Sequence, residues 1–253
     1  MSSTPPYKDF YYPLNVFMHI LTHEEGAVTY LHYGLFSHPG ESLASAQARS
    51  TQLILDRLPV PPASILEVGI GLGTTLHRLT QLGYEVDGIT PDDKQIAMVR
   101  ARYGESVRAH CAAFETFDAS HRYDVLLFQE SSQYIDSEAL FAKAATLSDQ
   151  ILVVDEFATQ PLDTPGSLHA LDEFLAAATR HGYHVEEQLD LSTQAAPTME
   201  YFTTRIPQWR DRLIADLAIT NQQVDDLIAS GALYRERYAS AAYVYRLFRF
   251  ARR

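Results

Sequence analysis

Three glycines at alternate positions, Gly69, Gly71 and Gly73, carry the clearest chemical implication in this sequence. They follow the apolar run Ile65–Val68 and precede a helical pattern that begins at Thr74. Glycine lets the backbone approach a ligand closely, and the N–H groups at the start of a helix attract polar or anionic ligand atoms. A strand, a glycine turn and a helix in this order therefore predict a turn that binds a ligand.

The spacing of these glycines departs from the dinucleotide-binding fingerprint. That fingerprint has the form G-x-G-x-x-G, and counting from Gly69 its third glycine falls on Thr74. An NAD(P)-dependent oxidoreductase on a Rossmann-like fold therefore fits the turn imperfectly, and it is one alternative function. A second alternative is a non-catalytic protein that binds the same cofactor, because a fold alone does not determine function.

The elements that would position the turn alternate along the chain from about Ala63 onward. Short β-branched runs separated by helical patterns are typical of a parallel sheet with crossover helices. The first crossover helix is expected over Thr74–Leu82, the second starts with Thr90 as N-cap and Pro91 at the first helical position, and a later helix covers Ser167–His181. Five strands and then an antiparallel pair are expected, namely Ile65–Val68, Val86–Ile89, Val107–Cys111, Val125–Phe128 and Ile151–Val154, followed by Val185–Leu191 and Ala241–Phe250.

The predicted architecture is an α/β, Rossmann-like, doubly wound sheet that is mostly parallel and has an antiparallel last strand. We expect a single domain over residues 1–253. Its expected parts are an N-terminal helical cap at 1–60, a cofactor-binding core at 61–195, a substrate-side insertion at 196–231 and the last strand at 232–253. The cap contains a helix over Glu41–Leu58, and the insertion carries a helical pattern through Trp209. Long insertions often supply substrate contacts.

Composition narrows the class of partner. The formal net charge of −12 opposes binding to a phosphate polymer, so no nucleic acid partner is expected. A single cysteine, Cys111, excludes an internal disulfide, and its thiol is expected on a buried strand. The N-terminus has no secretory signal pattern and no apolar stretch is long enough to span a bilayer, which predicts a cytoplasmic protein without a membrane partner. The oligomeric state stays open, and a homodimer is compatible with the sequence.

The segment from Glu67 to Gly73 resembles the E/D-x-G-x-G-x-G signature of the class I S-adenosylmethionine-dependent methyltransferases. The likeness covers about Tyr30 to Glu156. Within that family it is similar to the branch that contains tocopherol and sterol methyltransferases and cyclopropane fatty acid synthases. The motifs that carry this likeness are His32-Tyr33-Gly34, Gly88-Ile89-Thr90 followed by Gln95, and Glu130-Ser131-Ser132-Gln133-Tyr134-Ile135.

The resemblance implies the class I methyltransferase fold and S-adenosyl-L-methionine as cofactor, with S-adenosyl-L-homocysteine as product. It implies that Gly69, Gly71 and Gly73 approach the methionine and ribose portions of the cofactor, while Glu67 steadies the turn. Tyr33 would hydrogen-bond the methionyl carboxylate.

Most class I enzymes hold the ribose hydroxyls with an acidic residue at the end of the second strand. That position is Thr90 here, so the resemblance implies that Thr90 and Gln95 share the task through neutral hydrogen bonds. Four further cofactor contacts are implied, two near the adenine and two at the carboxyl end of the fourth strand: Phe114, Glu115, Gln129 and Glu130.

The implied function is methyl transfer to an O, N, S or C nucleophile of a small-molecule acceptor, in natural-product or secondary metabolism. The cyclopropane synthases of this branch have Glu-His where this chain has Gln133-Tyr134, which disfavours cyclopropanation. A soluble metabolite is favoured over a lipid as acceptor, because no basic amphipathic stretch offers contact with a membrane.

Oxygen acceptors of high pKa must lose a proton during transfer, so a general base is expected near the acceptor. The candidate catalytic residues are His19, His32, Glu130 and Glu156, with Tyr201 as a candidate for the acceptor pocket. His19 and His23 are four residues apart and could share one helix face beside Glu24. No third ligand with fitting spacing accompanies them, so no metal site is expected.

Overall fold

The computed structural model describes residues 7–160 and 168–252. The chain divides into two compact units. The first, called the sheet unit below, comprises Thr51–Ser192 and Ala242–Arg253. The second, called the helical unit, comprises Met1–Ser50 and Thr193–Ala241. The N-terminal cap and the insertion that the sequence distinguishes thus contribute to one and the same unit.

The sheet unit is built on seven main strands in the order β3-β2-β1-β4-β5-β8-β7, with a short strand, β6, beside β5. The strands β1 to β5 run parallel to one another, whereas β8 is antiparallel to both β5 and β7. This is the mostly parallel sheet with an antiparallel last strand that the sequence predicts. The strand bounds are β1 Ser64–Val68, β2 Glu85–Thr90, β3 Arg108–Cys111, β4 Val125–Gln129, β5 Gln150–Ala158, β6 His169–Ala170, β7 Tyr183–Asp190 and β8 Tyr243–Arg252.

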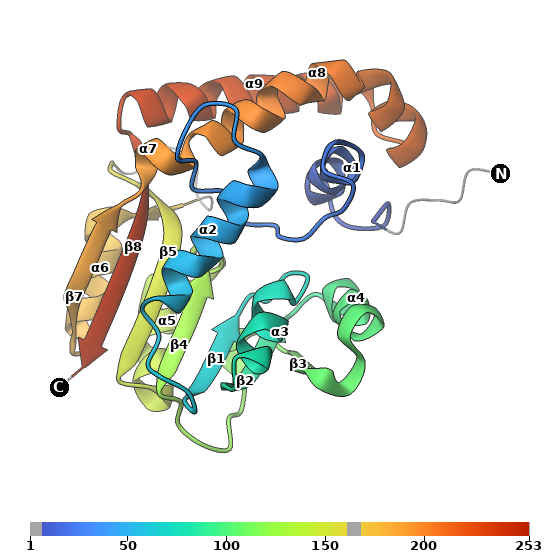
Figure 1. The fold of residues 1–253 in the computed structure, drawn as a ribbon. Coiled ribbons are helices and arrows are strands. Elements are labelled where there is room, and N and C mark those ends of the chain that lie inside the picture. The colour runs from blue at the N-terminus through green and yellow to red at the C-terminus, as the bar shows by residue number, and fades with distance from the viewer. Residues whose placement is uncertain (1–6, 161–167, 253) are drawn as a thin grey trace. The chain divides into compact units, whose positions relative to one another are not determined.

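Helices connect the parallel strands of this unit, with α5 and α6 on one face of the sheet and α3 on the other (Figure 1). The bounds are α3 Thr74–Gln81, α4 Asp93–Tyr103, α5 Ser137–Leu147 and α6 Leu171–Arg180, and three short 3-10 turns are η1 Gly104–Ser106, η2 Phe114–Thr116 and η3 Ser132–Tyr134. The core is continuous from the central strands to α5 and α6, through residues such as Phe128, Phe141 and Phe174. Burial of this apolar face stabilises the sheet and fixes its strand ends in place.

Three local predictions in the sheet unit are wrong. The helix α4 takes Asp92 as its N-cap, because that carboxylate accepts hydrogen bonds from the N–H groups of Lys94 and Gln95. The predicted cap, Thr90, is instead the last residue of β2, where its carbonyl accepts a hydrogen bond from Ala112 N–H at 3.0 Å. The first crossover helix, in contrast, begins at Thr74 as predicted.

The other two errors concern β3 and the start of α6. Cys111 is exposed, not buried, because β3 is an edge strand of the sheet. The helix predicted from Ser167 begins only at Leu171, since His169 and Ala170 pair with β5 as the strand β6. Ser167 itself lies outside the described residues.

The described part of the helical unit contains α1 Leu14–Glu24, α8 Pro197–Leu217 and α9 Asn221–Ala239. Two further helices, α2 Leu43–Leu55 and α7 Ser192–Ala195, contain the residues at which the chain passes from one unit to the other. The predicted helix over Glu41–Leu58 corresponds to α2.

The helix α9 extends beyond the predicted insertion. Residues 232–239, assigned from the sequence to the last strand, belong to this helix. A capping box at Thr220 and Gln223 starts the helix, and Val224, Leu227 and Gly231 are buried along it. The strand β8 therefore begins later than predicted, at Tyr243.

No helix within residues 7–160 and 168–252 has the length and hydropathy required to cross a bilayer.

Candidate functional site

The glycine turn after β1 has the conformation that its composition predicts. Gly69, Gly71 and Gly73 have φ angles of 77°, 52° and 73°, in the left-handed region that favours glycine. The N–H of Gly69 donates to Ile89 O at 2.8 Å, and the N–H of Gly73 donates to Ile70 O at 2.8 Å. The turn is therefore held by backbone hydrogen bonds and leads directly into α3.

At two of these positions, neighbouring side chains also leave no room for a Cβ atom. A Cβ atom on Gly69 would lie 2.3 Å from Cβ of Ser131, and one on Gly73 would lie 2.9 Å from Cγ2 of Val99. Contacts this short do not occur between real side chains, so the adjacent segments pack directly against bare backbone. Ser131 is fixed there, because its hydroxyl donates to Val68 O at 2.6 Å.

The side chain of Glu67, on β1 just before the turn, is buried at 3 % exposure. Its Oε2 atom has no hydrogen-bond partner among the described residues. Burial without a compensating partner raises the pKa of Glu67 to about 8. An orphaned buried carboxylate is costly in an apolar interior and is typical of a group that pairs with a ligand. The implied role of Glu67 in steadying the turn stays a prediction.

Thr90 and Gln95 form a buried pair at the end of β2. The hydroxyl of Thr90 donates to Oε1 of Gln95 at 2.9 Å, and both side chains are at most 9 % exposed. They are therefore close enough together to share the hydroxyl groups of one ligand, as the resemblance implies.

The carboxyl end of β4 carries Gln129 and Glu130. Oε1 of Gln129 accepts a hydrogen bond from Thr75 Oγ1 at 3.4 Å, while Nε2 of Gln129 is buried and has no partner in the described part of the chain. Glu130 has a φ of 53°, which is rare for a residue with a side chain. Its Oε1 accepts a 2.5 Å hydrogen bond from the hydroxyl of Tyr245 on β8.

A buried carboxylate supports the loop that follows Glu130. Oδ2 of Asp155, on β5, accepts hydrogen bonds from the backbone N–H of Ser132 at 2.9 Å, from the Ser132 hydroxyl at 2.6 Å and from the N–H of Gln133 at 3.3 Å. Burial raises the pKa of Asp155, and these donors oppose that rise. The left-handed backbone at Glu130 is thus accompanied by two supports, Tyr245 of β8 at its side chain and Asp155 of β5 at the loop that follows.

Two of these supporting residues, Asp155 and Tyr245, are not predicted from the sequence, and Ser131 and Ser132 are named there only as part of a family motif. One signal was available. Asp155 is an acidic residue inside an otherwise apolar run, and a charge there requires donors. No sequence signal distinguishes Tyr245 from the other aromatic residues of the last strand.

Phe114 and Glu115, expected near an adenine, lie on η2 after β3. Phe114 is buried and packs edge-to-face on Phe128, with ring centroids 5.2 Å apart. Glu115 is exposed. Both residues follow the carboxyl end of a parallel strand, the edge at which open α/β sheets bind ligands, and their predicted roles stay predictions.

The remaining predicted site residues belong to the helical unit. The hydroxyl of Tyr33 donates to Sδ of Met199 at 2.9 Å. His32 is buried, its Nδ1 lies 2.9 Å from Tyr33 O, and burial lowers the pKa of its ring to about 4. The hydroxyl of Tyr201 donates to Glu25 Oε1 at 2.8 Å, and desolvation raises its pKa. Their proposed contacts with the cofactor or the acceptor stay predictions.

His19 is fully buried on α1, and a third side chain with metal-ligand chemistry, which sequence spacing does not indicate, lies beside it and His23. Asp216 of α8, almost two hundred residues away in the sequence, lies beside them, and one ligand atom from each residue lies within 4.8 Å of the others. Sequence spacing alone does not reveal a partner on another helix.

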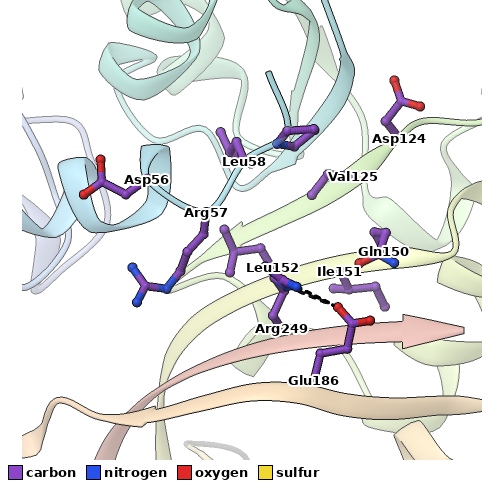
Figure 2. Close-up of a pocket in the computed structure, with 11 residues that line it drawn as sticks. Asp56, Arg57, Leu58, Asp124, Val125, Gln150, Ile151, Leu152, Glu186 and Arg249 are labelled. Carbon is purple, nitrogen blue, oxygen red and sulfur yellow. Dashed lines mark hydrogen bonds and ion pairs between the residues drawn. The ribbon is translucent and has the colours of Figure 1, made fainter. Parts of the chain in front are cut away.

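A separate hollow of about 660 Å³ opens in the sheet unit at the amino ends of β4 and β5 (Figure 2). Its lining includes Val125, Leu152, Arg57 and Arg249. Figure 2 shows Arg249 paired with Glu186, and Nη2 of Arg249 lies 2.9 Å from Oε2 of Glu186. Because the glycine turn lies at the carboxyl ends of the parallel strands, this hollow is not part of the cofactor site.

Comparison with known proteins agrees with this geometry. Residues 66–148 match a family model described as a methyltransferase domain. Residues 66–148 are therefore similar to a methyltransferase domain. The match spans the glycine turn, Thr90, Gln95 and the carboxyl end of β4, so the predicted family resemblance is confirmed for this segment.

Curated relatives also match over only part of the chain. The ubiquinone biosynthesis O-methyltransferase of Bradyrhizobium diazoefficiens is 30% identical over 95 residues, which are 36% of this chain and 38% of that protein. The enzyme of the same name from Nitrobacter winogradskyi is 28% identical over 80 residues, or 30% of this chain and 31% of that protein. The chain thus spans about a third of the length of these curated relatives.

Solved structures are similar over most of the chain. The cyclopropane synthase MmaA2 from Mycobacterium tuberculosis has a TM-score of 0.77 at 16% identity and covers 88% of this chain and 90% of its own. The O-methyltransferase from a trans-AT polyketide synthase multienzyme of Brevibacillus brevis, in complex with S-adenosyl-L-homocysteine, has a TM-score of 0.69 at 17% identity, with coverages of 88% and 84%. These similarities confirm the predicted class I methyltransferase fold.

Proposed function

We propose that this chain transfers the methyl group of S-adenosyl-L-methionine to a small-molecule acceptor. The observation that carries the proposal is the bare turn with left-handed backbone at Gly69, Gly71 and Gly73, followed by a helix start. Such a turn brings backbone N–H groups to a ligand at the carboxyl edge of the sheet.

The polar groups around the turn fit this cofactor. Glu67 offers a buried carboxylate oxygen without a partner in the described chain, which suits the cationic end of a methionyl group. Gln129 offers a buried amide N–H group that lacks an acceptor among the described residues. The Thr90 and Gln95 side chains offer neutral donors and acceptors for ribose hydroxyls.

When bound, the cofactor would supply a methyl carbon activated by its sulfonium for transfer to an acceptor lone pair. The chain's own residues bind and orient the reactants and exclude water. Glu130, at the end of β4, is our candidate to take the proton from an acidic O–H or N–H group of the acceptor. The Tyr245 hydroxyl orients its carboxylate.

We infer a compact acceptor from natural-product or secondary metabolism. Support comes from the names of the relatives. Two curated ones are O-methyltransferases of ubiquinone biosynthesis, and one similar structure is the O-methyltransferase of a polyketide synthase multienzyme. An oxygen nucleophile is the acceptor type that these names favour, and it is also the type that needs a base such as Glu130.

A transfer assay tests the proposal. The full chain is incubated with S-adenosyl-L-methionine and a panel of small phenols, alcohols, amines and thiols, and formation of S-adenosyl-L-homocysteine is measured. We expect product only when an acceptor of one class is present, and most strongly with phenols. Thermal stabilisation by NAD, with none by S-adenosyl-L-methionine, would instead support the oxidoreductase alternative. Stabilisation by the methyl donor with no turnover across the panel would support a non-catalytic protein.

A further inference from the structure

Three side chains of the helical unit form a cluster outside the proposed cofactor site. His19 and His23 lie one helical turn apart on α1, and Asp216 comes from α8. One ligand atom from each lies within 4.8 Å of the other two. The Nε2 atom of His19 is 3.6 Å from Oδ2 of Asp216.

His19 is oriented as a ligand would be. Its Nδ1 lies 3.3 Å from the hydroxyl of Tyr7, which leaves Nε2 facing Asp216. The ring is completely buried, and Nε2 has no hydrogen-bond partner among the described residues. Hydrogen bonding of one imidazole nitrogen commonly fixes the other for metal coordination.

The second histidine is oriented by an aromatic ring. His23 stacks on Trp209, with ring centroids 4.9 Å apart and an angle of 21° between the planes. The Trp209 Nε1–H group donates to Glu24 Oε1 at 2.7 Å, and Glu24 also pairs with Arg205 at 3.2 Å. Glu24, the carboxylate next to the histidines in sequence, is therefore engaged elsewhere, and Asp216 is the carboxylate available to the pair.

We propose that His19, His23 and Asp216 bind a divalent transition metal ion of the zinc type. Two imidazoles and one carboxylate are a ligand set that zinc accepts, whereas magnesium and calcium favour oxygen ligands throughout. Metal–ligand bonds of about 2.0–2.2 Å in a tetrahedron place neighbouring ligand atoms about 3.3–3.5 Å apart. The 3.6 Å between His19 Nε2 and Asp216 Oδ2 requires only a small adjustment.

The proposed metal site is open to solvent, and one nearby positive charge opposes the binding of a cation. The Asp216 side chain is 31% exposed and His23 is exposed, so an ion can enter and keep a water molecule in the fourth position. Arg212, whose guanidinium lies 5.3 Å from the Trp209 ring centroid, acts on His19 as a nearby positive charge. It opposes the ion and sets an upper limit to the affinity.

Calorimetric titration with zinc chloride tests the proposal. The full chain is prepared without a polyhistidine tag, stripped with a chelator and carried on a Cys111→Ser background, because Cys111 is an exposed thiol that could bind zinc itself. We expect one zinc ion per chain. Asp216→Asn and His23→Ala should each weaken the affinity at least about tenfold. His38→Ala removes an exposed histidine of the same unit and should leave the affinity unchanged.

The choice of variants avoids the buried His19, whose replacement could unfold the unit. Circular dichroism verifies folding, and His23→Gln replaces His23→Ala if the latter is unfolded. Absence of zinc binding by the parent chain would overturn the proposal. Equal affinities for the parent and Asp216→Asn would also overturn it, because zinc would then be bound elsewhere. Cobalt as a second probe should give the intense visible bands of a tetrahedral site in the parent and lose them in Asp216→Asn.

Discussion

The hydroxyl of Tyr245 on β8 donates a 2.5 Å hydrogen bond to Oε1 of Glu130 at the end of β4. The two residues are 115 positions apart in the sequence, and the bond fixes a carboxylate whose own backbone is in the left-handed region. A carboxylate held in one orientation beside the glycine turn can act as a base without first being ordered.

The first prediction concerns Glu130→Gln. If Glu130 removes the acceptor proton, kcat with a phenol or alcohol should fall about 100-fold, in line with general base catalysis. With a neutral amine, which can attack unaided, kcat should fall far less. The dissociation constant for S-adenosyl-L-homocysteine, measured by calorimetry, should change less than about twofold. Equal losses of kcat for both acceptor types would argue against a role in proton transfer.

Tyr245→Phe extends the first prediction and tests whether the Tyr245 hydroxyl positions the Glu130 carboxylate. We expect kcat to fall several-fold while KM for the methyl donor stays constant. The variant removes the hydrogen bond that orients the Glu130 carboxylate but keeps the carboxylate itself. Tyr183→Phe is a matched control. It removes another buried phenol that donates a 2.7 Å hydrogen bond, to Ser148 O, and it should leave kcat unchanged. A change in KM with constant kcat would contradict the positioning role of Tyr245.

The second prediction is a pH dependence of stability that arises at Glu67. Its pKa is raised by burial to about 8 in the folded chain, against an ordinary value of 4.5. The folded state therefore holds a proton that the unfolded state releases between these values. The free energy of unfolding should fall as the pH rises from about 4.5 to about 8, by a few kcal/mol at most for this group.

Glu67→Gln keeps the neutral, protonated shape at every pH. The difference in unfolding free energy between this variant and the parent should therefore increase with pH up to about 8 and then level off. Denaturation in urea at several pH values, without cofactor, measures it. Glu85→Gln, at the exposed start of β2, is the control and should show no such trend. A difference that stays constant from pH 5 to pH 9 would mean that Glu67 is not held in its protonated form.

Much of the fold follows from local sequence patterns, and some of it does not. The strands around Leu66, Leu126 and Val153 are predicted because short, mostly apolar runs between helices occur where a sheet is covered on both faces. The turn at Gly69 is predicted because glycine lets the backbone approach a ligand closely, whereas its left-handed φ is a finding of the structure. The edge position of Cys111 is not predictable from its own neighbours, since strand order decides which strand lies at the edge.

Prediction is also limited where two nearby residues could both cap the same helix. Thr90 and Asp92 both have N-cap chemistry, and the helix takes Asp92 because the strand continues through Thr90. At the candidate site, the glycines, Glu67 and the Thr90–Gln95 pair are found from motifs. Tyr245 and Asp216 are not, because each reaches its partner only through the tertiary fold.

The third prediction uses two glycines of similar backbone conformation. Gly69→Ala and Gly83→Ala both place a side chain at positive φ, 77° and 90°, which costs about 1–3 kcal/mol each. Only Gly69→Ala also forces a Cβ to 2.3 Å from Ser131, whereas the nearest atom to a Cβ at Gly83 is 3.8 Å away. Thermal denaturation should show the larger loss for Gly69→Ala, and calorimetry should show loss of cofactor binding only there. Unchanged binding in Gly69→Ala would show that the ligand does not approach this turn.

The fourth prediction concerns the hydroxyl of Thr90. Thr90→Val preserves the shape of the side chain but removes the group that bonds to Gln95 at 2.9 Å. If this pair holds the ribose, the affinity for S-adenosyl-L-homocysteine should fall about tenfold, the equivalent of one hydrogen bond of about 1.4 kcal/mol. Thr80→Val, on the same unit but bonded only to its own helix, should bind like the parent. Equal affinities for Thr90→Val and the parent would place the ribose elsewhere.

Calorimetric titration of the full chain with S-adenosyl-L-homocysteine tests the central claim most directly. The geometry at Gly69–Gly73 predicts saturable binding of one molecule per chain, with no comparable binding of NAD. Folded protein that gives no binding with either S-adenosyl-L-homocysteine or S-adenosyl-L-methionine would contradict the proposed cofactor site.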